Sequence, residues 1–280
     1  MLAAVGIGCT VQPLDGVVTL LVPTSEALRA RQQLVQYARE NREHEVEQQH
    51  GQKHHTQRYT RRFIDGLPAA VGCAGVLVLL HAWSRQGTFF QNWLSAGAAQ
   101  ARLILGGEWW RTMTALGLHA DLGHLASNVI FGIVFGLLVA QIFGSGLGWL
   151  VILLAGTAGN ALNALVQPET HTAIGASTAV FAAIGILSGV MWRRKRYARG
   201  LRRWTPLAGG LMLLVYLGIG GERTDIGSHA AGFATGVLSG VMLAQVHDRL
   251  PQGARPQRAF GAAAMLLFVL AWVLALRAHA

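Results

Sequence analysis

Charged residues are scarce in this chain: Asp, Glu, Lys and Arg make up only 13% of its 280 residues. A soluble domain carries about 25%, so the composition excludes an ordinary soluble protein. Cysteine is rarer still, because only Cys9 and Cys73 occur, in different regions and without the spacing of a metal or redox motif. The two cysteines therefore indicate neither kind of site.

Basic residues are absent from the start of the chain, where the first Lys or Arg is Arg29. A secretory signal peptide begins with a positively charged stretch, so none is indicated. The formal net charge is nonetheless +10. Because the basic residues cluster between apolar runs and form no continuous face, they indicate membrane topology and argue against nucleic acid as a partner.

Apolar residues dominate instead: 52% of the chain is hydrophobic and 35 residues are glycine. Membrane bundles use small residues where helices pack closely. Most of seven apolar spans approach or reach the roughly 20 residues that cross a bilayer core. The spans are Gly66–Trp83, Leu122–Phe143, Leu147–Val166, Ala173–Trp192, Pro206–Gly220, Ile226–Val246 and Phe260–Leu276. The sequence therefore predicts an all-α, polytopic transmembrane bundle.

The first 62 residues have a different character. Val17–Val22 predicts a short strand, and Ser25–Gln49 predicts a polar helix with Ser25 as its cap. The stretch Gly51–Arg62 is basic and histidine-rich, which is typical of a solvated linker beside a membrane. Its neighbourhood has no paired zinc-ligand spacing. The histidines concerned are His44, His50, His54 and His55.

Basic residues also predict the orientation. They gather in loops 193–203 and 249–258 and just before the first span, whereas loops 167–172 and 221–225 carry only Arg223. Positively charged loops stay in the cytosol. We therefore expect a cytosolic N-terminus and a C-terminus on the outer side.

Polar residues on three spans are predicted to share one depth. The second, fourth and sixth spans enter from the outer side, and His124, Asn128, Ser177 and His229 lie within about their first two turns. At 1.5 Å per residue, these side chains lie roughly 3–10 Å below the outer edge of the apolar core. Unrelated polar residues have no reason to share a level, so this arrangement indicates a site.

Glycines at helical spacing follow both Ser177 and His229. Those on the fourth span are Gly185 and Gly189, and those on the sixth are Gly232, Gly236 and Gly240. Two bare faces pack closely, which would bring a hydroxyl nucleophile to a general base. Taken singly, Ser177 bonding its own helix and His229 as a buried polar contact are simpler readings. Taken together, the two residues indicate a Ser–His dyad.

Four motifs stand out: Gly175-Ala176-Ser177, the run His229 to Gly232 with Gly236, the pair Trp110-Arg111, and the group His119, His124 and Asn128. With these motifs on the expected spans, the chain resembles the rhomboid family of intramembrane serine proteases. The resemblance covers roughly residues 66–246. It implies a six-helix catalytic core, to which this chain adds a seventh span.

The resemblance also implies roles for single residues. Ser177 is the expected nucleophile and His229 the expected general base and then acid. His124, Asn128 and the backbone N–H of Ser177 are the expected oxyanion donors. The supporting positions are Gly175, Gly232, Gly236, Phe181, Trp110 and Arg111.

Two of the supporting roles are specific. Phe181 is placed like the aromatic side chain that stacks on the catalytic imidazole, with packing in the core or against lipid as the alternative. Trp110-Arg111 is expected to organise the first outer loop without touching substrate.

Two positions are left open by the sequence. Rhomboids usually have glycine directly after the nucleophile, where this chain has Thr178. Asp225 lies four residues before His229, so it either orients the imidazole or caps the helix. Because rhomboids resemble dyads, we favour a helix-end cap or a solvent-exposed carboxylate.

We therefore expect residues 1–62 to be a cytosolic segment, 63–246 the catalytic core, and 247–280 a linker and seventh helix. The predicted enzyme is a serine endopeptidase of the bacterial inner membrane. Its partners are transmembrane protein substrates and the lipid bilayer, with no nucleic acid, cofactor or metal; its oligomeric state is unreadable. The short, glycine-containing fifth span is a candidate gate for substrate.

Two rival functions come from other classes. One is a non-catalytic rhomboid-like protein that binds transmembrane clients. The other is a transporter or haem protein that uses His119, His124 and His229 as relays or ligands. The chain shows no inverted repeat, which argues against transport.

Overall fold

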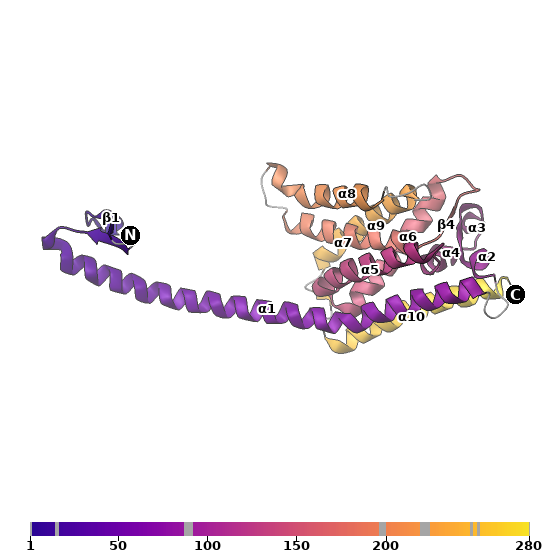
Figure 1. Cartoon of the computed structure of the whole chain (residues 1–280), viewed down its shortest axis with the longest axis horizontal. Coiled ribbons are helices and arrows are strands. Elements are labelled where there is room, and N and C mark those ends of the chain that lie inside the picture. The colour runs from indigo at the N-terminus through magenta and orange to yellow at the C-terminus, as the bar shows by residue number, and fades with distance from the viewer. Residues whose placement is uncertain are drawn as a thin grey trace. The chain divides into compact units, whose positions relative to one another are not determined.

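The computed structural model describes residues 2–14, 17–86, 92–195, 200–218, 225–246, 249–250 and 253–279. It divides into two compact units, Met1–Thr60 and Arg61–Ala280. Helices predominate in both, with short strands between them (Figure 1).

The first unit is a small hairpin packed on the start of a helix. After a 3₁₀ turn (η1, Leu2–Val5), strand β1 (Thr10–Leu14) pairs antiparallel with β2 (Val17–Leu21). The predicted strand is thus present as β2, and β1 is a partner beyond the prediction. A second 3₁₀ turn (η2, Thr24–Glu26) leads into the helix.

Helix α1 (Ala27–Gln86) corrects two expectations. It follows η2, whose N-cap is Pro23, so Ser25 does not cap it. It also continues past Gln49 through the stretch that we expected to be a linker. The physical reason is that no proline interrupts residues 27–67, and the helix-forming Gln, Glu, Lys and Arg residues there outweigh the ~1 kcal/mol that Gly51 costs.

The second unit is a polytopic helical bundle, as predicted. Its helices after α1 are α5 (Leu122–Phe143), α6 (Ser145–Val166), α7 (Ser177–Arg194), α8 (Thr205–Gly218), α9 (Ile226–Val246) and α10 (Ala254–Arg277). Among the described residues, five segments are long and apolar enough to cross a membrane, namely Ile64–Gln86 of α1 and helices α5, α6, α9 and α10. Large apolar side chains on these helices face outward, as a lipid-facing surface requires.

Two of the seven expected spans fall outside those five. Helix α7 has 18 residues and ends in Arg193-Arg194. Helix α8 is a shorter apolar helix of 14 residues, and the last two residues of its predicted span, 219–220, lie outside the described part of the chain.

Helix α7 forms the centre of the bundle, because it packs against α5, α6, α8 and most extensively α9. Its inward side chains include Ala182, Ala183 and Ile186, which are almost fully buried with Val139 and Phe143 of α5. A central helix of small residues lets its neighbours approach closely.

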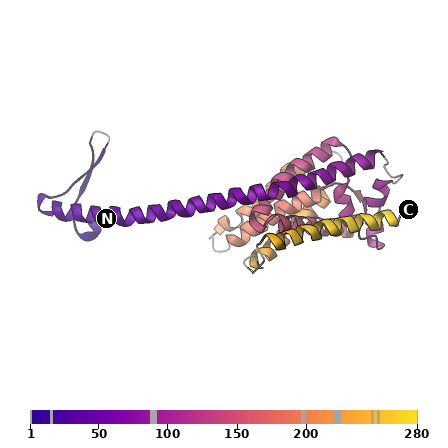
Figure 2. The same cartoon turned by 90° about the horizontal axis from the view of Figure 1, so that it is seen from below.

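Short elements at one end of the bundle precede helices α5 and α7. They are α2 (Trp93–Gly97), β3 (Ala99–Gln100), α3 (Ala101–Leu105), α4 (Arg111–Thr114), the 3₁₀ turn η4 (Ala115–Gly117) and β4 (Thr172–Ala173). Strand β3 pairs antiparallel with β4. The far end of α10 lies at this same end of the unit in both views (Figures 1 and 2).

Candidate active site

Ser177 is the first residue of α7, directly after a tight turn. Gly175 in this turn has a φ of +129°, a conformation that only glycine adopts readily. Its backbone N–H donates to the carbonyl of Ala115 at 2.9 Å, which anchors the turn. The first N–H groups of a helix have no partner within it, so the start of α7 presents hydrogen-bond donors beside the Ser177 hydroxyl.

His124 approaches the same turn from α5. A methyl group placed on Gly175 would lie 2.7 Å from Cε1 and Nε2 of His124 and 3.6 Å from Oγ of Ser177. The imidazole and the hydroxyl therefore flank one glycine, and a side chain there would collide with the ring. Gly175 is required for its backbone conformation and for this close approach.

His229 lies in the first turns of α9 and is buried, with 7% of its surface exposed. Its ring centroid is 4.4 Å from that of Phe181. Phe181 follows Ser177 by four residues, so both side chains lie on one face of α7. The aromatic contact therefore brings the imidazole of His229 to the face that carries Ser177.

The backbones of α7 and α9 approach closely along a row of glycines. Each glycine of α9 meets a carbonyl oxygen of α7 that lies 54 residues earlier: Gly232 meets Thr178, Gly236 meets Ala182 and Gly240 meets Ile186. The constant offset shows that the two helices run in the same direction. At this register His229 is level with Gly175, two residues and about 3 Å along the axis from Ser177.

Asn128 does not point freely at Ser177. Its Nδ2 donates to the carbonyl of His124, one turn earlier on α5, at 2.9 Å, and the side chain is buried. An amide carries two N–H donors, so one remains for another acceptor.

Thr178 points away from the nucleophile and into a gap between α6 and α9. A methyl group on Gly159 would lie 2.8 Å from Cγ2 of Thr178, and one on Gly232 would lie 3.0 Å from it. The two glycines accommodate the extra bulk that follows Ser177. The side chain, only 2% exposed, acts as packing between three helices.

Asp225 caps α9 and pairs with His171. Its Oδ1 accepts from the backbone N–H of Ser228 at 3.0 Å, and its Oδ2 lies 2.8 Å from Nε2 of His171. Asn163 of α6 donates to the same Oδ2 at 3.0 Å. Burial opposes ionisation, but the bonds from Ser228 and His171 outweigh it and hold the pKa of Asp225 below its usual value. These contacts favour the helix cap over a role in orienting His229.

His119 supports the turn before Ser177. Its Nε2 accepts from the backbone N–H of Ala176 at 3.4 Å, and its ring centroid is 5.1 Å from that of His124. Burial and the neighbouring His124 lower the pKa of His119 to about 4 from its usual 6.5. The ring therefore stays neutral near pH 7, as an acceptor must.

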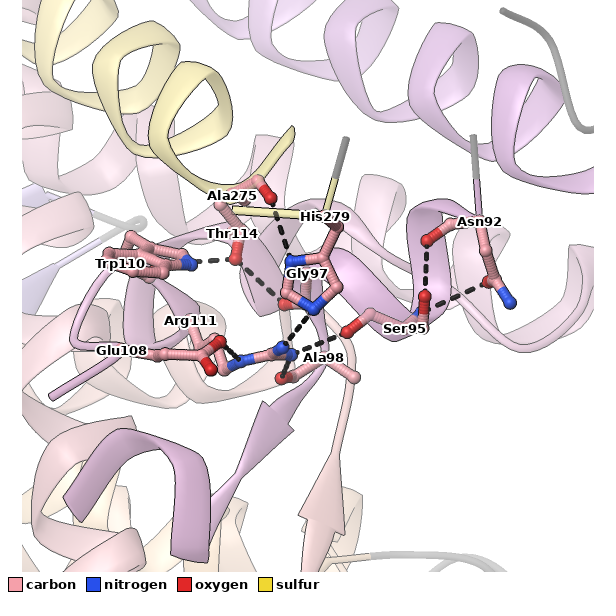
Figure 3. Close-up of polar contacts among 10 residues, drawn as sticks. All are labelled: Asn92, Ser95, Gly97, Ala98, Glu108, Trp110, Arg111, Thr114, Ala275 and His279. Atoms are coloured by element: carbon pink, nitrogen blue, oxygen red, sulfur yellow. Dashed lines mark hydrogen bonds and ion pairs between the residues drawn. The ribbon is translucent and has the colours of Figure 1, made fainter. Parts of the chain in front are cut away.

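Arg111 organises the segment between α1 and α5, and it is completely buried. Its Nε donates to Glu108 at 2.6 Å, and its Nη1 donates to the carbonyls of Ser95 and Ala98 at 2.8 and 2.9 Å (Figure 3). Trp110 forms the N-cap of the short helix α4 that Arg111 begins. Trp110 and Arg111 therefore lie among the short elements of residues 93–117, called the loop scaffold below, rather than beside Ser177.

Three further polar residues around this site are not among the predicted site residues. Asn160 of α6 donates to the carbonyl of Thr112 at 2.8 Å, while Asn163 and His171 join the Asp225 cluster. Asparagines inside an apolar helix are unusual, and that signal was available for Asn160 and Asn163. For His171, in a short polar loop, no such signal exists.

No metal centre is found in the described part of the chain, where no three His, Cys, Asp or Glu residues are grouped to hold an ion. The side chains of His44, His50, His54 and His55 lie outside the described residues.

The region that contains these residues is also similar to known proteins. The Rhomboid domain family matches residues 106–246, about half of the chain, which includes all the residues predicted for the site.

Individual relatives show the same similarity. The chain is 31% identical over 176 residues to the rhomboid protease GluP of Bacillus subtilis, covering 62% of this chain and 33% of that protein. It is 30% identical over 161 residues to the chloroplastic rhomboid-like protein 11 of Arabidopsis thaliana, covering 53% and 56%. It is 32% identical over 145 residues to the rhomboid-like protease 3 of Toxoplasma gondii, covering 50% and 54%. The chain thus spans between a third and just over half of these relatives.

Proposed function

This chain belongs to the rhomboid family, and from that premise we propose that it is an intramembrane serine endopeptidase with Ser177 and His229 as its dyad. One observation carries the proposal: the ring of His229 lies against Phe181, one helical turn from Ser177, beside the row of glycines along which the backbones of α7 and α9 pack closely. That contact supports a hydroxyl and an imidazole acting together.

In the proposed reaction His229 takes the proton of the Ser177 hydroxyl as its oxygen attacks the scissile carbonyl. The tetrahedral intermediate collapses when His229 returns the proton to the leaving amine. Water then adds to the acyl-enzyme with His229 again as the base. The product is a carboxylic acid, and the Ser177 hydroxyl is restored.

The oxyanion of the tetrahedral intermediate is proposed to lie near the start of α7. The backbone N–H of Ser177 is the first donor, and the positive end of the helix dipole favours negative charge there. The His124 ring, across Gly175 from the hydroxyl, is the second donor. The remaining N–H of Asn128 is the third, after its amide turns toward the site.

The proposed substrates are transmembrane proteins that enter from the bilayer. Helix α8 is the proposed gate, because its outward residues Met212 and Tyr216 are 71% and 83% exposed. Helix-weakening residues near the cut would let a substrate segment unwind and present its carbonyl. The half-buried Ser177 is accessible enough to be reached.

The proposed setting is a bacterial inner membrane, with the N-terminus in the cytosol and the site near the outer face. Basic loops on one side of the spans support this orientation. Residues 63–246 form the proposed catalytic core, with 1–62 in the cytosol and 247–280 as an added element.

A fluorophosphonate probe tests the proposal, because it reacts only with an activated serine hydroxyl. We expect labelling of the wild type and none of Ser177→Ala or His229→Ala. If the wild type is not labelled but captures a transmembrane client, the non-catalytic binder replaces the enzyme as the function.

A further inference from the structure

The seventh helix, α10, packs on the loop scaffold through a tryptophan. The ring of Trp272 fills the space beside two glycines: a methyl group would lie 3.0 Å from its Cζ3 at Gly97 and 3.5 Å from its Nε1 at Gly117. Its ring centroid is also 5.1 Å from that of Trp93. The C-terminal half of α10 is thus joined to the same short elements that Arg111 organises.

On the C-terminal side of Trp272, His279 reaches the guanidinium of Arg111. Its Nε2 lies 3.0 Å from Nη2 of Arg111, and its Nδ1 lies 3.0 Å from the carbonyl oxygen of Ala275 (Figure 3). A guanidinium only donates hydrogen bonds, so Nε2 must be the acceptor. The proton then resides on Nδ1, which donates to Ala275, and the ring is neutral in this arrangement.

Arg111 connects this histidine to the segment that carries Ser177. Its Nη1 holds the carbonyl of Ala98, the residue before β3. Strand β3 pairs with β4, and Ala99 of β3 lies opposite Ala173 of β4. Ser177 follows four residues after Ala173, so hydrogen bonds and two short stretches of backbone connect α10 to the nucleophile.

We propose that His279 is a positioning residue, which completes the hydrogen bonding of the buried Arg111 and so holds the β3–β4 pair and the Ser177 turn in register. This inference rests on the proposed function for its effect on cleavage. The seventh helix would then stabilise the loop scaffold through these contacts.

A cation at position 279 would reverse the contact. The ammonium group of a lysine has no acceptor to offer the guanidinium of Arg111, and Glu108 is already bonded to Arg111 Nε. Two cations would then face each other, so His279→Lys should loosen this segment.

Helix α10 has a separate attachment at its other end. Gln257 donates from Nε2 to the carbonyl of Phe143 and accepts at Oε1 from the N–H of Leu147, both at 3.0 Å. A change at His279 therefore leaves Gln257 and Trp272 holding the helix. Gln257→Leu is the matched control, because it weakens α10 far from Arg111.

The test measures cleavage of a model transmembrane substrate in detergent at pH 7.5. His279→Gln, a neutral acceptor, should keep the wild-type rate within about twofold. His279→Lys, a permanent cation, should lose about tenfold at pH 7.5, as expected for one charge-assisted bond. Gln257→Leu should lower the unfolding temperature and keep the wild-type rate within about twofold.

A second readout does not depend on chemistry. Amide hydrogen exchange of residues 93–117 is measured for each His279 variant combined with Ser177→Ala, at one pH and temperature. We expect faster exchange in His279→Lys and wild-type exchange in His279→Gln. Equal exchange in both variants overturns the positioning role, whether or not the wild type cleaves. A wild type that never cleaves, but whose exchange responds to His279→Lys, contradicts only the proposed function.

Discussion

The ring centroids of Phe181 and His229 lie 4.4 Å apart, and both side chains are buried. Phe181 belongs to the helix that begins at Ser177, and His229 to the helix that packs most extensively against it. This contact fixes which face of each helix meets the other. A substitution that removes this contact is therefore the first test.

Phe181→Ala should slow cleavage about tenfold, because an aromatic pair contributes up to about 1.5 kcal/mol beyond its buried area and 1.36 kcal/mol is a factor of ten in rate. Fluorophosphonate labelling of Ser177 should slow in parallel. Phe181→Tyr keeps the ring and serves as the control. Unchanged labelling in Phe181→Ala would show that the contact does not orient His229.

Gly232→Ala should lower the stability of the folded protein by roughly 1–3 kcal/mol, the usual cost of overpacking. The added methyl would collide with the carbonyl of Thr178, whereas a methyl on Gly209 of α8 meets nothing within 4 Å. Thermal unfolding of the two variants in detergent compares them directly. Equal unfolding temperatures would contradict the close backbone approach of α7 and α9.

Thr178→Gly should cost stability and leave substrate preference unchanged. The side chain fills space between Gly159 and Gly232, so its removal leaves a cavity that costs about 1–2 kcal/mol. The unfolding temperature and the cleavage of two substrates with different residues at the cut are measured together. A changed preference would place Thr178 at the substrate instead.

Acid should destabilise the protein through His119. Its pKa is lowered to about 4 in the folded state from the usual 6.5, so the unfolded chain takes up the proton first as the pH falls. Stability is complete above pH 6.5 and declines toward pH 4, by up to about 3 kcal/mol for this shift. His119→Asn should unfold at a lower temperature at pH 7.5 and depend less on pH between 6.5 and 4. A pH dependence equal to that of the wild type would assign the acid sensitivity to other groups.

The sequence was most informative where regular helices carry the signal. The apolar spans gave the bounds of α5 and α9 as the structure has them, because few charges interrupt those spans. The glycine spacing on α7 and α9 predicted their close packing, since only bare faces allow backbone contact. The unbroken α1 differs from the predicted linker because neither charge nor histidine content breaks a helix.

Contacts between residues far apart in the chain could not be predicted from the sequence. The pairing of His171 with Asp225 and of His279 with Arg111 joins residues 54 and 168 positions apart. Neither histidine lies in a periodic pattern, and the fold alone brings each to its partner. The same holds for Thr178, whose packing against Gly159 depends on how α6 crosses α7.

The most direct test of the dyad is cleavage of a model transmembrane substrate by the purified full chain in detergent. The wild type should cut it, and Ser177→Ala and His229→Ala should each lose at least about a thousandfold in rate while unfolding at wild-type temperatures. A substrate cut equally well by Ser177→Ala would contradict the account, as would a folded wild type that cuts nothing.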